Sequence, residues 1–158
     1  MTNAGFESVA SADLLGGPCR GAALTEAETA ALAAALETHG LSGLVSPRLP
    51  LDLTPMADEA AYLATAKLLL SSEADVVVVG LVPLTKRLET EDAAVYSPFA
   101  EALAAAARSA GKGLGVAVEG GPLYDAYRQA LREAGLPVFL TLEEALEGLR
   151  LIASESPL

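Results

Sequence analysis

The stretch from Asp75 to Thr85 reads Asp-Val-Val-Val-Val-Gly-Leu-Val-Pro-Leu-Thr, and it decides the fold. Four consecutive valines followed by Gly80, Leu81 and Val82 leave no polar face for water, so both faces must be covered. A β-branched run of this kind is typical of a central strand in a parallel sheet that lies between helices. A buried helix is the weaker interpretation, because β-branched side chains lose rotamer freedom in helices and Gly80 and Pro83 interrupt the run. Ligands of open parallel sheets bind beyond the carboxyl ends of the strands, so the loop after Val82 is the first candidate for function.

Helical and strand patterns alternate along the rest of the chain. Capping boxes, in which Thr is followed three residues later by Glu, occur at Thr25 and again at Thr141. The amphipathic pattern of residues 123–134 places Leu123 toward the core and Arg128 toward solvent. The helices are expected at 8–15, 25–39, 56–71, 97–110, 123–134 and 141–152, and the strands near Leu44 and at 75–82, 114–118 and 137–140. This order predicts an α/β fold, a flavodoxin-like doubly wound parallel sheet in three layers.

The N-terminal segment has the character of a phosphate-binding loop. Asn3, Ala4, Gly5, Phe6 and Glu7 lead into the helix expected from Ser8, and the free amides of a first helical turn attract anions. Such a loop normally follows a strand, yet Met1 stands where that strand should end, so the first strand of the predicted sheet is truncated. Either the chain is an excised piece or the missing strand comes from elsewhere. We expect one domain over residues 1–153 and a C-terminal tail over 154–158.

Composition narrows the possible partners. The 158 residues include 10 basic and 21 acidic side chains, giving a formal net charge of −11, which repels phosphate backbones and anionic membranes. We therefore expect no nucleic-acid partner and no membrane association. The single cysteine, Cys19, allows no internal disulfide, and there is no signal-like or membrane-spanning run, so a cytoplasmic location is predicted.

Few side chains are suited to catalysis or metal binding. His39, the only histidine, falls in the last turn of an expected helix, where a structural role near the negative helix end is favoured. Cys19 has no base nearby in the sequence and is interpreted as inert. One His and one Cys do not make a metal site, so no metal ligands and no catalytic residues are predicted. Asp52 and Asp75 border strands, but the acidic pair and the lysine of a phosphoacceptor site are missing, and both are expected to cap chain ends.

A second candidate anion site lies at Gly120 and Gly121, just before the helix expected from Leu123. The plain alternative is that these glycines make only a tight turn, since glycine turns before helices are common in α/β proteins. A flavin-binding flavodoxin is disfavoured, because a Ser/Thr-rich phosphate loop and stacking aromatic residues are not evident in the sequence.

Several stretches together resemble the NDP-forming acyl-CoA synthetases, also called ADP-forming acetate-CoA ligases. They occur in the same order as in that family and are Thr2-Asn3-Ala4-Gly5-Phe6-Glu7, Leu51-Asp52-Leu53-Thr54-Pro55, Val82-Pro83-Leu84-Thr85, Gly120-Gly121-Pro122-Leu123-Tyr124-Asp125, Gly135-Leu136-Pro137-Val138-Phe139 and Leu142-Glu143-Glu144-Ala145. The resemblance covers nearly the whole chain. It is to one module of those enzymes, the succinyl-CoA-synthetase-like flavodoxin domain.

The resemblance implies a role in forming a phosphohistidine and acyl-phosphate site between ligase domains. The module would contribute the helix start at Asn3 to Ser8, and Glu7 could orient the incoming histidine. Pro83, Leu84, Thr85, Lys86 and Arg87 would form a loop near this site. The partners implied are the CoA-binding, phosphohistidine and ATP-grasp domains, and CoA, ATP or ADP and Mg belong to the complete enzyme, with no cofactor bound by this chain alone.

The chain also departs from the family pattern. The family's phosphohistidine loop is absent, and His39 does not match it. Leu49-Pro50 stands where many members have Asn-Pro, and Thr85-Lys86 replaces Thr-Pro. The isolated chain is therefore expected to be inactive as a ligase. The alternative hypothesis is a stand-alone interaction or regulatory domain of the same fold, with a homodimer as one possible assembly.

Overall fold

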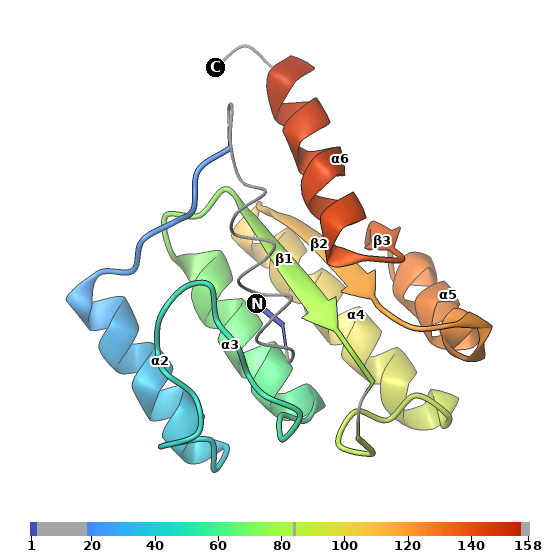
Figure 1. The fold of residues 1–158 in the computed structure, drawn as a ribbon, viewed down its shortest axis with the longest axis horizontal. Helices are drawn as coiled ribbons and strands as arrows, with labels where there is room; N and C mark the ends of the chain where they lie inside the picture. Colours follow the sequence, from blue (N-terminus) through green and yellow to red (C-terminus); the bar gives the residue numbers. More distant parts are fainter. Residues whose placement is uncertain (3–18, 84, 156–158) are drawn as a thin grey trace.

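The computed structural model describes residues 1–2, 19–83 and 85–155, with side chains described up to residue 151. Its helices are α2 (Glu26–Thr38), α3 (Glu59–Ser71), α4 (Ala93–Ala110), the short η1 (Pro122–Tyr124), α5 (Asp125–Glu133) and α6 (Leu142–Glu155), and its strands are β1 (Val76–Leu81), β2 (Gly113–Val118) and β3 (Val138–Phe139) (Figure 1). The expected helix at 8–15 lies outside the described residues.

The sheet is parallel and is centred on the valine run. β1 pairs with β2 in register from Val76 with Gly113 to Leu81 with Val118, and β2 pairs with the short β3. On the other side of β1 lies the N-terminus of the chain. Thr2 forms a parallel bridge with Asp52, and the Gly80 amide donates to the Met1 carbonyl at 2.7 Å. The spatial order is therefore the 51–53 segment, residues 1–2, β1, β2 and β3, which is the flavodoxin-like order of strands.

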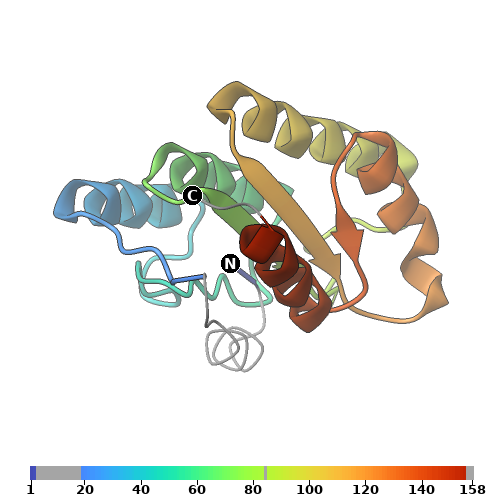
Figure 2. The ribbon, with the colours of Figure 1, turned by 90° about the horizontal axis from the view of Figure 1, so that it is seen from above.

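Helices cover both faces of this sheet, which makes three layers (Figure 2). α3, α4 and α5 pack on one face, where Val77, Val79 and Val116 belong to the main hydrophobic core. α6 packs on the other face, where Ala117 contacts Leu142 and Ala145, with Val78 and Phe139 alongside. The alternation of Val77, Val78 and Val79 between the faces explains why the run carries no polar residue. The predicted α/β flavodoxin-like fold is confirmed.

Short sequence signals predicted the start of α2 and the end of α4 correctly. Thr25 and Glu28 form the predicted capping box at the start of α2, and Gly111 ends α4 in the left-handed conformation with φ 63°. α3 begins at Glu59, because the Asp58 carboxylate accepts from the Ala61 amide and caps the helix three residues after the predicted start.

The predicted strand near Leu44 is wrong. Residues 42–44 form a turn, Gly43 has φ 80°, and the Leu44 side chain is 60% exposed. Only Asp52, later in the same segment, bridges to another extended residue. The prolines at 47 and 50 keep this segment out of a regular ladder, because proline has no N–H to donate.

The predicted start of α4 at Ser97 is also wrong, by four residues. The Asp92 carboxylate accepts from the Ala94 amide and starts the helix at Ala93, so Pro98 lies inside it. The ring of Pro98 is exposed. A proline can be tolerated there because the carbonyl that loses its helical partner is on the solvent side. Within the described residues, no helix is both long and apolar enough to cross a membrane.

Candidate functional site

Three loops meet at the carboxyl edge of the sheet. They precede α3, connect β1 to α4 and connect β2 to α5. The Thr85 hydroxyl donates to the Pro55 carbonyl at 2.8 Å, and the Tyr124 hydroxyl lies 3.5 Å from the Pro83 carbonyl. The fold therefore brings Pro83 and Thr85 to the same edge as the Gly120–Gly121 turn. Lys86 and Arg87 are exposed in the same loop.

Carboxylates hold the β1–α4 loop in shape. The Glu59 carboxylate accepts from the Glu89 amide at 2.5 Å, and the Glu89 carboxylate accepts from the amides of Glu91 and Asp92. The hydrogen bonds from the Glu91 and Asp92 amides lower the pKa of the Glu89 carboxyl group. Most acidic groups of this loop are thus engaged with backbone N–H groups, which removes much of their repulsion toward an anion.

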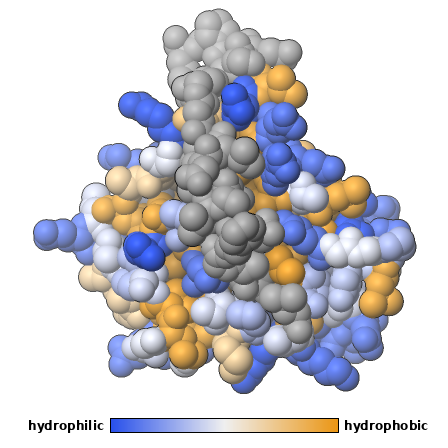
Figure 3. Space-filling view, in the orientation of Figure 1, coloured by the Kyte–Doolittle hydropathy of each residue, from blue (hydrophilic) through white to orange (hydrophobic). Residues whose placement is uncertain are grey.

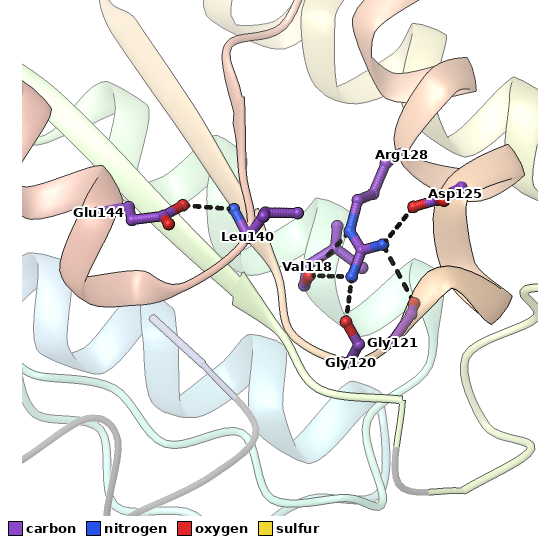
Figure 4. A network of polar contacts seen from close by, with 7 residues as sticks. All are labelled: Val118, Gly120, Gly121, Asp125, Arg128, Leu140 and Glu144. Carbon is purple, nitrogen blue, oxygen red and sulfur yellow. Dashed lines mark hydrogen bonds and ion pairs between the residues drawn. The ribbon is translucent and has the colours of Figure 1, made fainter.

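The β2–α5 turn is built around a buried arginine. Arg128 is 1% exposed, and its guanidinium donates to the carbonyls of Val118, Gly120 and Gly121 and to the Asp125 carboxylate (Figure 4). The bond to the Gly120 carbonyl is 2.5 Å long. Because the C=O and N–H of one peptide unit point in opposite directions, the Gly121 N–H points away from Arg128. Gly120 has φ 137° and lies against the Tyr124 ring, where a Cβ would meet ring carbons at 2.6 Å.

The sequence pattern predicted the wrong solvent exposure for two side chains near this turn. Arg128 was expected in solvent and is buried, and Leu123 was expected in the core and is 79% exposed. Helical periodicity treats an arginine as a solvent residue. Helical periodicity carries no information about three carbonyls at the end of a strand that need hydrogen-bond donors. The signal available in the sequence was the Gly-Gly-Pro turn itself, which leaves carbonyls without a regular ladder.

Most described helices are capped by a side chain at the N-terminus. Thr25 caps α2, Asp58 caps α3, Asp92 caps α4, and the Thr141 hydroxyl accepts from the Glu144 amide at the start of α6. Neither η1 nor α5 has a side-chain cap. Among the described helices, the segment that begins after Gly121 is therefore the one whose first amides are not capped by the protein's own side chains.

Apolar side chains are also exposed at this edge. Met56 precedes α3, Val95 lies in the first turn of α4, Leu123 follows β2 and Leu140 follows β3, and they are 47%, 44%, 79% and 50% exposed. Figure 3 shows hydrophobic residues among hydrophilic ones on the face that it displays. These four residues come from four separate segments that begin or end at the carboxyl edge of the sheet.

The remaining predicted residues have simpler positions. Asn3 to Ser8 and Leu84 lie outside the described residues. His39 is the C-terminal cap residue of α2, and the Asp52 carboxylate accepts from the nearby Thr54 amide. Cys19 is a free thiol of intermediate exposure. Within the described residues, no group of three or more His, Cys, Asp and Glu side chains could hold a metal ion.

Solved structures give the clearest comparison. The chain matches the dinucleotide-forming acetyl-coenzyme A synthetase 1 of Ca. Korarchaeum cryptofilum with a TM-score of 0.75 and 21% identity, over 98% of this chain and 32% of that chain. The same protein in complex with phosphate and ADP gives the same values. PH0766 from Pyrococcus horikoshii OT3 matches with a TM-score of 0.78 and 23% identity, over 98% of this chain and 34% of that chain.

The chain thus has the fold of one domain of these larger proteins and spans about a third of their length. The predicted resemblance to this class of synthetases is confirmed at the level of the fold. No family model matches the chain, and no curated protein sequence matches it.

Proposed function

We propose that the chain is a ligase-domain module of an NDP-forming acyl-CoA synthetase. Its carboxyl edge contributes helix N-termini to a phosphohistidine and acyl-phosphate site that is completed by other domains. Those domains supply the histidine, the nucleotide and CoA. The matched structures support a modular role, because this chain corresponds to one third of each of them.

The single observation that carries the proposal is the uncapped helix start after Gly121. Amides at a helix N-terminus carry partial positive charge and favour a phosphoryl group. The Arg128 guanidinium adds a full positive charge behind the turn, although the Asp125 carboxylate, 2.7 Å away, offsets part of it. The exposed cations Lys86 and Arg87 follow the neighbouring strand.

The N-terminal helix start is proposed as the second half of the site. Thr2, the last described residue before it, lies between Asp52 and the carboxyl end of β1. The side chains of Met56, Val95, Leu123 and Leu140 then provide an apolar border against which a partner domain can pack.

A titration of the isotope-labelled chain tests this proposal. Inorganic phosphate, acetyl phosphate and CoA are added in turn while amide signals are followed. We expect shifts at Asn3 to Ser8 and at Gly120 to Leu123, because N–H groups that bind an oxyanion change their chemical shift. Shifts confined to loops at the opposite edge of the sheet would contradict the proposal.

A pair of substitutions at Gly121 sharpens the test. Gly121 has φ −78°, and a Cβ there meets nothing within 4 Å, so Gly121→Ala keeps both the fold and the N–H. Gly121→Pro fits the same φ but removes the N–H. Phosphate-induced shifts at Leu123 should persist in the alanine variant and weaken severalfold in the proline variant.

A stand-alone interaction domain is the second candidate, and the exposed apolar edge favours it equally. Light scattering on the purified chain separates the two. Self-association without any phosphate-dependent shift supports the interaction domain, whereas a monomer with phosphate-dependent shifts supports the ligase module.

A further inference from the structure

A small cavity lies at the amino edge of the sheet, at the opposite end of β2 from the candidate site. It has a volume of about 320 Å³ and is lined by the C-terminal part of α4, the start of β2 and the loop from α5 to β3. This volume is at the lower end of the range of ligand pockets, roughly 300–1,000 Å³. The apolar part of the lining is buried and consists of Ala104, Ala107, Leu114 and Leu136. A small apolar group fits such a lining.

The main-chain groups of Leu114 border this cavity. In a parallel ladder the N–H and C=O of one residue point to the same side, and successive residues point to opposite sides. The Gly113 amide donates to the Asp75 carbonyl and so faces β1, whereas the Val116 amide donates to the Pro137 carbonyl and faces β3. Leu114 therefore faces the same side as Val116. Within the described part of the chain, neither its N–H nor its C=O has a hydrogen-bond partner.

The loop before β3 explains why Leu114 is unpaired. The register that pairs Val116 with Val138 would place Leu136 opposite Leu114. The Leu114 carbonyl would then accept from residue 137, which is a proline without an N–H. The chain before Pro137 also curves back to α5, where the Leu136 amide donates to the Leu131 carbonyl at 3.1 Å. Buried backbone groups are nearly always paired, so a partner from outside the chain is expected for Leu114.

The cavity presents both signs of charge. Arg108 lines it, and one guanidinium nitrogen donates to the Ala134 carbonyl at 3.3 Å, which leaves the other nitrogens free to bind an anion. The helices α4 and α5 both end at this cavity, beside Gly111 and Gly135, and the last carbonyls of a helix carry partial negative charge. An anion alone would be repelled by the helix ends, and a cation alone by Arg108. A ligand that carries both charges matches both features.

We propose that this cavity binds a small apolar α-amino acid in its zwitterionic form. Its carboxylate accepts from the Leu114 N–H and the Arg108 guanidinium, its ammonium group donates to the Leu114 carbonyl, and its side chain lies against Ala104 and Ala107. The inference does not depend on the proposed function, because the cavity uses none of the carboxyl-edge loops.

A titration of the isotope-labelled 158-residue chain with L-leucine at neutral pH tests the proposal. A saturable shift is expected at the Leu114 amide, because this N–H gains an acceptor. Two matched ligands separate the charges: isocaproate is leucine without its ammonium group, and isoamylamine is leucine without its carboxylate. Each should bind at least about tenfold more weakly than leucine, because each leaves one charged feature of the cavity without its partner.

Substitutions at Arg108 test the carboxylate contact. Arg108→Gln should weaken binding of leucine and isocaproate by about tenfold without weakening that of isoamylamine, because only the first two ligands carry a carboxylate. Arg108→Lys keeps the charge and should restore part of the leucine binding. Arg132→Gln is the matched control, since Arg132 is exposed on α5 outside the cavity lining, and it should bind leucine as the unmodified chain does. Midpoints of thermal unfolding confirm that each variant is folded.

Other outcomes overturn the proposal. No saturable shift of the Leu114 amide with millimolar leucine would exclude an amino-acid site. Equal affinities for leucine and isocaproate would assign the cavity to carboxylic acids, and equal affinities for leucine and isoamylamine would assign it to amines. Leucine binding that is unchanged in Arg108→Gln would place the ligand elsewhere.

Discussion

At the scale of single residues, two buried tyrosines differ in one contact. The Tyr62 hydroxyl donates to the Gly80 carbonyl at 3.1 Å, whereas the Tyr127 hydroxyl is buried without a hydrogen-bond partner among the described residues. Burial raises the pKa of both tyrosines, and the charge of Glu59 adds to the rise at Tyr127. Burying a hydroxyl without a partner costs free energy, whereas a partnered one contributes to stability.

The matched substitutions should therefore have opposite effects. Tyr62→Phe is expected to lower the free energy of unfolding by about 1 kcal/mol, and Tyr127→Phe to leave it unchanged or raise it by up to about 1 kcal/mol. Urea titration of both variants measures the difference. The edge-on contact between Tyr96 and Tyr127, with ring centroids 5.4 Å apart, is retained by phenylalanine and does not distort the comparison. A larger loss for Tyr127→Phe than for Tyr62→Phe would refute the assignment.

Gly80 is required by the close approach of the N-terminus. A Cβ at this position would lie 3.0 Å from both Cβ and Oγ1 of Thr2. Gly80→Ala should therefore destabilise the chain by about 1–3 kcal/mol, because the Met1–Thr2 segment must shift within the sheet. Gly115→Ala is the control on the next strand, since a Cβ there has its nearest contact, with Phe139, at an ordinary 3.5 Å. Similar midpoints of thermal unfolding for the two variants would contradict this account.

At the scale of elements, Arg128 joins β2 to α5. Removing its guanidinium in Arg128→Met leaves three carbonyls and the Asp125 carboxylate without their donor, so we expect a loss of about 3–5 kcal/mol. Arg128→Lys keeps the charge but cannot reach all the carbonyls and should lose less. Arg132→Ala, exposed on the same helix, should change stability by no more than about 0.5 kcal/mol. Chemical denaturation compares the three, and equal effects at both arginines would disprove the role.

The elements also show which sequence signals are sufficient to predict local structure. The α2 capping box is set by Thr25 and Glu28 alone, and a contact that close in sequence is readable directly. The valine run identifies β1 because a strand buried on both faces excludes polar residues. Arg128 was misplaced because its partners, the carbonyls of Val118, Gly120 and Gly121, come together only after β2 and α5 have packed. Such tertiary contacts override helical periodicity.

At the scale of the whole molecule, the parallel arrangement could be predicted, but the geometry of the candidate site could be predicted only in part. Parallel strands gather their carboxyl ends at one edge, so the convergence of the Pro83 and Gly120 loops follows from strand order alone. The hydrogen bond from Thr85 to Pro55 and the approach of Tyr124 to Pro83 depend on loop conformations that no periodic pattern specifies.

The buried amine of Met1 makes the stability of the 158-residue chain depend on pH. Desolvation by burial lowers the pKa of the Met1 ammonium group from 8.0 to about 6. Between these values the unfolded chain holds a proton at this amine that the folded chain has released, so the free energy of unfolding rises with pH from about 6 to about 8. The gain is at most about 3 kcal/mol, and it is lost as pH falls through the folded pKa.

Urea titrations at pH 5.5, 7 and 8.5 measure this gain in the free energy of unfolding. Acetylation of the Met1 nitrogen removes the titration and should flatten the profile over this range. A profile that is equally steep after acetylation would assign the effect to another group and show that this amine is not desolvated in the folded chain.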